Sequence, residues 1–222
     1  MHTAGSPASR VGAILSHVQN EDELIPALRD IRWREMVRIA WRDLAGWAGL
    51  EETLHDLSDL ADACVNGALG VLSCGHVQRH GVARNAQGEP QGLVVLGMGK
   101  LGAHELNFSS DIDLIFAYPE NGASDGPKLL DNEEYFARLA QKLVRALDEM
   151  TADGFVFRVD LRLRPFGEAG PLTLSFNAME TYYQNHGREW ERYAFIKARP
   201  VAGDLAQGGR LLAMLRPFVY RR

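Results

Sequence analysis

Two aspartates at the start of an apolar segment are the residues of this chain best suited to chemistry. Asp111 and Asp113 follow a glycine-rich run, and the segment 97–116 reads GMGKLGAHELNFSSDIDLIF. In a β-strand, side chains at i and i+2 leave the same face, so the two carboxylates point one way while Ile112 and Leu114 point into a core. Carboxylates held this close repel each other, and Mg²⁺ relieves the repulsion because it prefers oxygen ligands and commonly binds carboxylates together with substrate phosphates. The segment predicts a site for a divalent metal and phosphate.

The residues around this pair are suited to holding a phosphate. Backbone N–H groups near Gly99, Lys100 and Ser110 are expected to bind the phosphate tail, because glycine lets the backbone approach an anion closely. Lys100 would add a point charge, although a solvated surface lysine explains it equally well. The aspartate pair itself has the alternative interpretation of a solvated acidic turn. Its place at the mouth of an apolar strand, where an unpaired charge is costly, favours the functional interpretation.

A third aspartate lies in a strictly alternating segment. Residues 155–164 read FVFRVDLRLR, which predicts a strand with one apolar face and one face carrying Arg158, Asp160, Arg162 and Arg164. In isolation, the pattern fits an exposed strand face with cross-strand ion pairs. Beside the first strand, Asp160 would complete a triad able to hold two Mg²⁺ ions about 4 Å apart, and the arginines would neutralise phosphate oxygens.

The elements that must position these residues alternate in type. Strands are predicted over 93–96 and 111–118, with a short helix over 100–106 between them. Asp131 is a predicted N-cap for a helix through Met150, whose apolar residues share a face that would pack on the sheet. The catalytic unit is predicted to span 92–175, after a polar loop over 81–92.

The flanking segments are predicted to be helical. Residues 1–20 are small and polar and predict a flexible N-terminus. Residues 21–80 carry apolar side chains at steps of three and four, and residues 176–222 predict a further helical segment that is truncated at its end. Trp33, Trp41 and Trp47 lie in the first helical segment, where aromatic residues at helical spacing favour a core role over a ligand platform.

Composition limits the class of protein. The net charge of −5 over 222 residues argues against a dedicated nucleic-acid binder. The chain has no run of eighteen apolar residues and its N-terminus lacks an apolar signal core, which favours a cytoplasmic location over membrane insertion or secretion. Cys64 and Cys74 need no disulfide, and a metal site from Cys74, His76 and His80 has poor spacing.

Three segments resemble the glutamine synthetase adenylyltransferase family: the run over 97–116, RVDLRLRPFGEAGPL over 158–172, and YYQNHGREWERYAFIKARPVAGD over 182–204. The resemblance extends over roughly 31–222. It implies an α+β fold with the mixed sheet of polymerase-β-type nucleotidyltransferases, flanked by helical segments. It also implies that Asp111, Asp113 and Asp160 are the catalytic and metal-binding residues for Mg²⁺, and that Arg162 and Arg164 contact anions.

The resemblance further implies a substrate and partners. Members of the family attach AMP to a tyrosine of glutamine synthetase or remove it, with ATP, ADP and inorganic phosphate as small-molecule partners and a PII signalling protein as a regulator. The segment NFSSDIDLIF resembles the N-terminal of the two nucleotidyltransferase domains in the family, which removes AMP by phosphorolysis. ATP-dependent adenylylation and a non-catalytic nucleotide- or partner-binding module are the alternatives. Ala103 departs from the glycine that the family generally has there, which puts a positive φ at that position in doubt.

Overall fold

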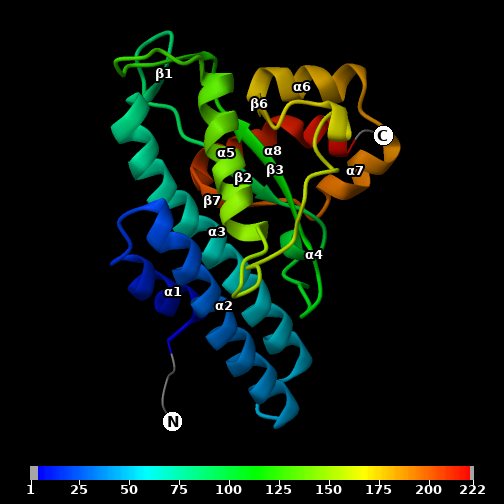
Figure 1. The fold of residues 1–222 in the computed structure, drawn as a ribbon. Helices are drawn as coiled ribbons and strands as arrows, with labels where there is room; N and C mark the ends of the chain where they lie inside the picture. The colour runs from blue at the N-terminus through cyan, green and yellow to red at the C-terminus, as the bar shows by residue number, and fades with distance from the viewer. Residues whose placement is uncertain (1–4, 221–222) are drawn as a thin grey trace.

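The computed structural model describes residues 5–220, which form a mixed α+β fold (Figure 1). The helices of this described part are α1 (Pro7–Leu15), α2 (Glu21–Leu44), α3 (Leu50–His80), α4 (Gly99–Gly102), α5 (Asn132–Asp148), α6 (Phe176–Asn185), α7 (Glu189–Phe195) and α8 (Leu205–Val219), with a 3₁₀ turn over Gly167–Ala169. The strands are β1 (Ala83–Asn85), β2 (Val94–Gly97), β3 (Ile112–Tyr118), β4 (Gly122–Ser124), β5 (Val159–Asp160), β6 (Thr173–Ser175) and β7 (Arg199–Gly203).

The main sheet is mixed and is built around β3. Its strand order is β5-β3-β2-β7, and β6 also pairs with β3. The pairs β2–β3 and β2–β7 are antiparallel, whereas β5 pairs in parallel with the start of β3 and β6 with its end. The chain between β5 and β6 therefore leaves the sheet beside the start of β3 and returns beside its end. A separate two-stranded sheet joins β1 to β4.

Both faces of the main sheet are covered, because successive side chains of β3 enter different cores. Leu114 and Phe116 pack in the core formed with α3 and α5, whereas Ile115 and Ala117 pack in the core formed with α6 and α8. Figure 1 shows α5 in front of the sheet and α8 behind it. By the same alternation, Asp113 lies on the side of Ile115 and opens toward α6–α8.

The first twenty residues are more ordered than the sequence predicts. Pro7–Leu15 form α1, whose N-cap Ser6 accepts a hydrogen bond from the Ser9 backbone N–H. Val11 and Leu15 are buried against α3, and Arg10 pairs with Glu35 of α2 at 2.7 Å. The prediction of a flexible segment over 1–20 is wrong for this helix because its apolar side chains find a core. Residues 1–4 lie outside the described part.

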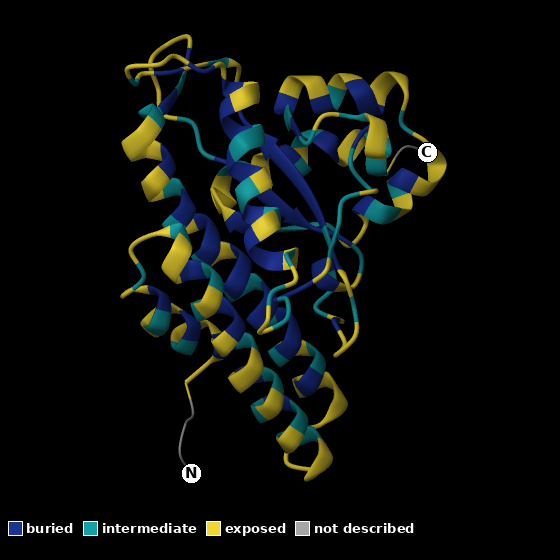
Figure 2. Cartoon of the chain, in the orientation of Figure 1, coloured by how far each residue is buried: buried dark blue, intermediate teal, exposed yellow. Residues whose placement is uncertain are grey.

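The helical segment 21–80 is confirmed as α2 and α3, but the core role of its tryptophans is wrong. Trp33, Trp41 and Trp47 are 65%, 64% and 66% exposed. Figure 1 shows α2 and α3 extending as a pair beyond the rest of the molecule, and Figure 2 shows that their projecting ends are largely exposed. The buried face of α2 is formed by Leu24, Leu28, Ile31 and Ile39 instead. Trp47 lies in the turn between α2 and α3, and the helical spacing of Trp33 and Trp41 left open whether their side chains are covered.

Two segments contain strands that the sequence does not predict. The loop over 81–92 contains β1, which pairs with β4. The segment 176–222, predicted as helical, contains β7, which extends the main sheet by pairing with β2. Pro200 lies inside β7 at the irregularity between Val95 and Leu96, where it marks a bulge in the strand.

The alternating segment 155–164 is not one strand. Only Val159–Asp160 pair with β3, because the Asp160 carboxylate accepts the Arg162 backbone N–H at 2.8 Å and turns the chain out of the sheet. Upstream, Val156 and Phe157 donate to the Leu147 carbonyl at the end of α5. Val156, predicted on the charged face, is fully buried for this reason. Side-chain hydrogen bonding overrides the alternation.

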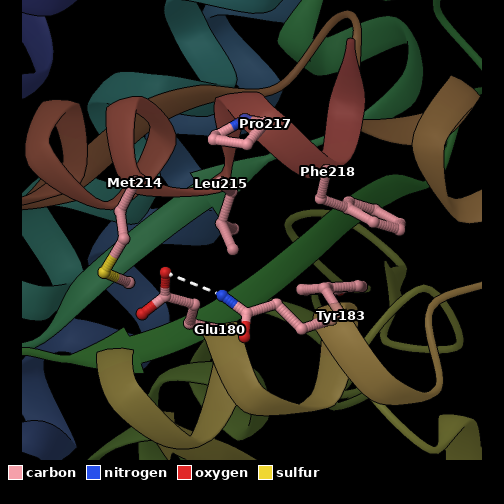
Figure 3. A pocket seen from close by; sticks show the side chains of 7 residues that line it. Glu180, Tyr183, Met214, Leu215, Pro217 and Phe218 are labelled. Carbon is pink, nitrogen blue, oxygen red and sulfur yellow. Dashed lines mark hydrogen bonds between the residues drawn. The ribbon is translucent and has the colours of Figure 1, made fainter. Parts of the chain in front are cut away.

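Two apolar features away from the carboxylates belong to packing. By length and composition α3 is apolar enough to cross a membrane, yet residues such as Leu60 and Val65 are fully buried against neighbouring helices, as in a core helix. A cavity of about 430 Å³ lies between α6 and α8, where Tyr183 stacks on Phe218 with ring centroids 4.9 Å apart (Figure 3). Its other labelled side chains are mostly apolar.

Candidate active site

The pairing of β3 with β5 brings together two of the predicted carboxylates. Asp113 lies directly across from Asp160 in this parallel register, one residue after Ile112 pairs with Val159. Residues that are partners across a parallel pair project to the same side, so both carboxylates face the side covered by α6–α8. Asp111 lies just before β3, close enough for its charge to raise the pKa of Asp113. The long-range pairing therefore joins two sequence segments nearly fifty residues apart.

Asp113 lies against the backbone of the glycine-rich turn. Gly99 has φ +52°, and a Cβ built there would lie 2.6 Å from Asp113 Oδ2. The Met98 N–H donates to the Asp113 carbonyl at 2.9 Å. Burial, followed by the charges of Asp160 and Asp111, raises the pKa of Asp113 above its ordinary value. A carboxylate crowded by like charges is one that a bound cation would stabilise.

Arginines hold the other two carboxylates. Arg162 binds Asp160 through its side chain, with Nε 2.9 Å from Oδ2, and this hydrogen bond is the main reason that the pKa of Asp160 falls below its ordinary value. Arg158 pairs with Asp111 and donates to the Ser109 carbonyl at 2.7 Å. The oxygens of Asp111, Asp113 and Asp160 do not all lie within 4.8 Å of one another. The two ion pairs explain the separation because each draws its carboxylate toward a guanidinium.

These side chains border an open cavity of about 440 Å³. Asp111, Asp160 and Arg158 line it, together with two acidic residues that the sequence analysis missed, Asp148 and Glu168. Asp148 ends α5 and accepts the Val159 N–H at 3.3 Å. Neither residue stands out in sequence, since Asp148 belongs to an ordinary helix end and Glu168 to a glycine-bearing loop.

Arg164, predicted to contact an anion, donates hydrogen bonds to the backbone of its own loop. Its Nη1 donates to the Leu161 carbonyl at 2.9 Å and its Nη2 to the Glu168 carbonyl at 3.1 Å. These bonds hold the loop between β5 and β6 in shape. The guanidinium still borders the cavity, so its contact with an anion stays a prediction.

The residues predicted to hold a phosphate tail are brought together. Lys100 Nζ lies 3.4 Å from Ser110 Oγ, and Gly99 begins α4 beside Asp113. Ala103 has φ −85°, so the alanine found there is accommodated without strain. The positive φ of this turn falls on His104, at +56°. Whether these groups bind phosphate stays a prediction.

A separate cluster also has metal-binding residue types. Asp59, Asp62 and His104 place ligand atoms within 4.8 Å of one another, whereas Cys74, His76 and His80 form no such group among the described residues. Both carboxylate oxygens of Asp62 accept hydrogen bonds from Arg199, at 2.6 and 3.1 Å. Because Arg199 already neutralises Asp62, we interpret the cluster as an ion-pair network that ties β7 to α3.

The carboxylates of β3 and β5 fit a divalent metal better. They supply oxygen ligands only, which is the donor set that Mg²⁺ prefers. Among the residues that the structure describes, none gives Asp113 a cationic partner at hydrogen-bonding distance, and burial followed by repulsion from Asp160 and Asp111 raises its pKa. Because Gly99 has no side chain, the Asp113 carboxylate can lie against its backbone. That Asp111, Asp113 and Asp160 hold a metal stays a prediction.

The mixed sheet, with acidic residues on neighbouring strands beside a glycine-rich turn, is consistent with a polymerase-β-type nucleotidyltransferase domain. Residues 1–214 match the family described as glutamate-ammonia ligase adenylyltransferase. The chain belongs to this family. The resemblance identified from sequence segments is thus confirmed over almost the whole chain.

Curated relatives agree with this assignment. Proteins named bifunctional glutamine synthetase adenylyltransferase/adenylyl-removing enzyme match this chain in three bacteria. The relative from Thioalkalivibrio sulfidiphilus is 61% identical over 99% of the chain, that from Nitrosococcus oceani 63% over 94%, and that from Pseudomonas aeruginosa 58% over 100%. The chain covers 23%, 22% and 23% of these relatives, respectively, so it spans less than a quarter of their length.

Proposed function

We propose that this chain is a Mg²⁺-dependent nucleotidyltransferase that removes AMP from an adenylylated tyrosine of glutamine synthetase by phosphorolysis. The observation that carries the proposal is the register of β3 and β5, which places Asp113 across from Asp160 beside the glycine-rich turn. The relatives' name includes both the adenylyl-transferring and the adenylyl-removing activity. The phosphorolytic direction rests on the resemblance of NFSSDIDLIF to the N-terminal copy of the family.

In the proposed reaction, an oxygen of inorganic phosphate attacks the phosphorus of the AMP-tyrosyl group. The bond from phosphorus to the tyrosine oxygen breaks, that oxygen takes up a proton, and ADP is released with unmodified tyrosine. Asp111, Asp113 and Asp160 would hold Mg²⁺, which would offset charge on the phosphoryl group. No covalent intermediate with the enzyme is required.

The chain's own residues have separate tasks in this proposal. Lys100 and the backbone N–H groups near Gly99 and Ser110 would orient the phosphate tail, because they lie together at the start of α4. Arg158 and Arg162 now pair with Asp111 and Asp160, so anion binding would draw the guanidinium groups away and free the carboxylates for the metal. Substrate and metal binding would thus support each other.

Cellular context is part of the proposal and rests on the family. A cytoplasmic location and regulation by a PII signalling protein are expected. ATP-dependent adenylylation of the same tyrosine is the second candidate, and it is favoured by the other half of the relatives' name. The carboxylates serve either direction equally, since direction depends on how nucleophile and leaving group are positioned.

A paired assay on one preparation tests the function. The chain is given adenylylated glutamine synthetase with phosphate, and unmodified glutamine synthetase with ATP, each with and without Mg²⁺. We expect ADP release only in the first reaction and only with Mg²⁺. Asp111→Asn should abolish it, whereas Glu133→Gln, an exposed carboxylate at the opposite end of α5 from Asp148, should leave it unchanged.

Two results contradict the proposal in different ways. Efficient transfer from ATP with no response to phosphate would reverse the direction and leave the metal site in place. Absence of turnover in both reactions, with nucleotide still bound, would favour the non-catalytic module.

A further inference from the structure

A second cavity adjoins the one lined by Asp111 and Asp160. It measures about 460 Å³ and lies between the loop after β5 and the helices α6 and α7. Arg162 and Arg164 line both cavities, so the two meet at these guanidinium groups. The volume lies within the range of pockets that hold small organic ligands. This second cavity is called the aromatic cavity below.

The aromatic cavity has a strained aromatic residue at its edge. Phe166 has φ +62°, in the left-handed region that bulky residues rarely adopt, and it is 53% exposed. Its ring meets Tyr182 edge to face, with centroids 4.4 Å apart. The turn is held by a hydrogen bond from the Gly167 N–H to the Arg164 carbonyl at 2.8 Å. Backbone strain that keeps an apolar ring exposed points to a ligand-binding role.

The far wall of the aromatic cavity is held rigidly. Glu191 is buried, and its carboxylate accepts hydrogen bonds from the Tyr182 hydroxyl at 2.9 Å and from the Arg188 N–H at 2.7 Å. These bonds join α7 to α6. They fix the backbone that carries Trp190, which lines the cavity and is 47% exposed.

Guanidinium groups and aromatic rings both line the aromatic cavity. Arg162 and Arg164 lie where it meets the carboxylates, and the exposed rings of Phe166 and Trp190 border the rest together with Arg188. Guanidinium groups bind phosphate, and exposed aromatic rings stack on nucleobases. A nucleotide has both chemistries at the two ends of one molecule.

We propose that the aromatic cavity holds the purine base of the adenylyl group, stacked on Phe166 and Trp190. The phosphorus would then lie toward Arg162 and the carboxylates. The inference rests on the proposed function for the identity of the base, and it adds the residues that bind it. Asp113 opens toward the same α6–α8 side, which places base and metal on one face of the sheet.

Calorimetry with ADP and with pyrophosphate, each with Mg²⁺, tests the inference on the full chain. Pyrophosphate has the charged groups of ADP and no base. Phe166→Gly keeps the positive φ accessible and removes the ring, and Trp190→Ala removes the second ring. We expect each variant to weaken ADP binding about 5- to 150-fold and to leave pyrophosphate binding unchanged. Trp190→Phe should restore most of the affinity.

Trp33→Ala is the matched control, because it removes an exposed tryptophan from α2 and should leave both affinities unchanged. The inference is overturned if wild-type chain does not bind ADP, or if both ring variants bind it as wild type does. Equal losses for ADP and pyrophosphate would also overturn it, because the rings would then act on the phosphate site.

Function and cavity can fail separately. If phosphorolysis proceeds but both ring variants bind ADP as wild type does, only the assignment of the aromatic cavity is wrong. If the ring variants weaken ADP binding but the wild-type chain shows no turnover in either direction, only the proposed function is wrong. If the variants spare ADP but raise the KM for adenylylated glutamine synthetase, the cavity binds the tyrosine-bearing segment of the protein substrate instead.

Discussion

Contact between Gly99 and Asp113 constrains the candidate site at the level of single residues. A positive φ and a side-chain oxygen 2.6 Å from the position of a Cβ both require glycine. The neighbouring carboxylates differ in pKa. Burial and like charges raise the pKa of Asp113, whereas Arg162 lowers the pKa of Asp160. Position within the site, rather than residue type, sets the behaviour of each acid.

Gly99→Ala should lower the free energy of unfolding by roughly 1–3 kcal/mol and abolish turnover, because the methyl group displaces the Asp113 carboxylate and the backbone is strained. Urea unfolding and the phosphorolysis assay measure the two effects. Gly75→Ala is the control: it lies in α3 with open space around it and should stabilise by about 1 kcal/mol. Full activity of Gly99→Ala would show that the turn does not position Asp113.

Asp113→Asn should make the metal-free chain more stable at pH 7. The native state holds this proton more tightly than the unfolded chain, whose pKa is near 3.8, so ionisation lowers stability as the pH rises through 3.8 and the raised native pKa. The amide removes that loss. In thermal melts across pH, the stability difference between the variant and wild type should disappear below pH 3.8. Mg²⁺ should stabilise the wild-type chain but not the variant.

Asp160→Asn is the counterpart with the opposite sign. The pKa of Asp160 is lowered, so its ionised form contributes stability above pH 3.8 that is lost as the pH falls through the native pKa. This variant should melt below wild type at pH 7. A shift of the same sign for both variants would contradict the assigned environments.

For helices and strands, periodicity predicts the type of element, whereas side-chain hydrogen bonds and packing determine where each element ends and which face is buried. The strand predicted over 155–164 shortens to β5 because Asp160 caps a turn. That turn releases the loop carrying Arg162, Arg164 and Phe166, which border the aromatic cavity. A longer strand would have held these side chains in the sheet.

Trp41→Ala should change the free energy of unfolding by no more than about 0.5 kcal/mol, because the ring is 64% exposed on α2. Leu28→Ala on the same helix should cost about 2–5 kcal/mol, because this side chain is fully buried. Urea unfolding of both variants compares the two faces. A loss of several kcal/mol for Trp41→Ala would mean that another surface covers the aromatic face in solution.

At the scale of the whole molecule, the segment after residue 175 is part of the sheet's support. β2 lies between β3 and β7, and α8 covers the face that contains Val94 and Leu96. Arg199 of β7 also reaches Asp62 of α3 and the Leu101 carbonyl at the end of α4. The residues predicted as a separate helical segment thus complete the core around the site.

A chain ending at residue 175 should not fold cooperatively, because it leaves the β2 edge unpaired and exposes the core that contains Leu211 and Leu215. Circular dichroism during thermal unfolding and amide proton dispersion in NMR are the measurements, with the full chain as control. A sharp transition and dispersed spectrum for the shorter chain would establish that 92–175 and its N-terminal helices form an independent unit.

Local sequence patterns are enough to predict the acidic pair, the third aspartate and most elements around them. Short-range rules suffice there: the i, i+2 geometry of Asp111 and Asp113 and the cap of α5 by Asp131 depend on neighbours along the chain. Helix periodicity likewise predicted α2, α3 and α5. The family resemblance added the fold class, which the mixed sheet bears out.

Local patterns do not show which surfaces meet. The pairing of Asp113 with Asp160, the arginine partners of the carboxylates and the place of β7 depend on contacts between distant segments, which no local pattern encodes. The exposure of Trp41 and the left-handed Phe166 follow from the same cause. A periodic pattern defines a face, but burial of that face depends on what the rest of the chain packs against it.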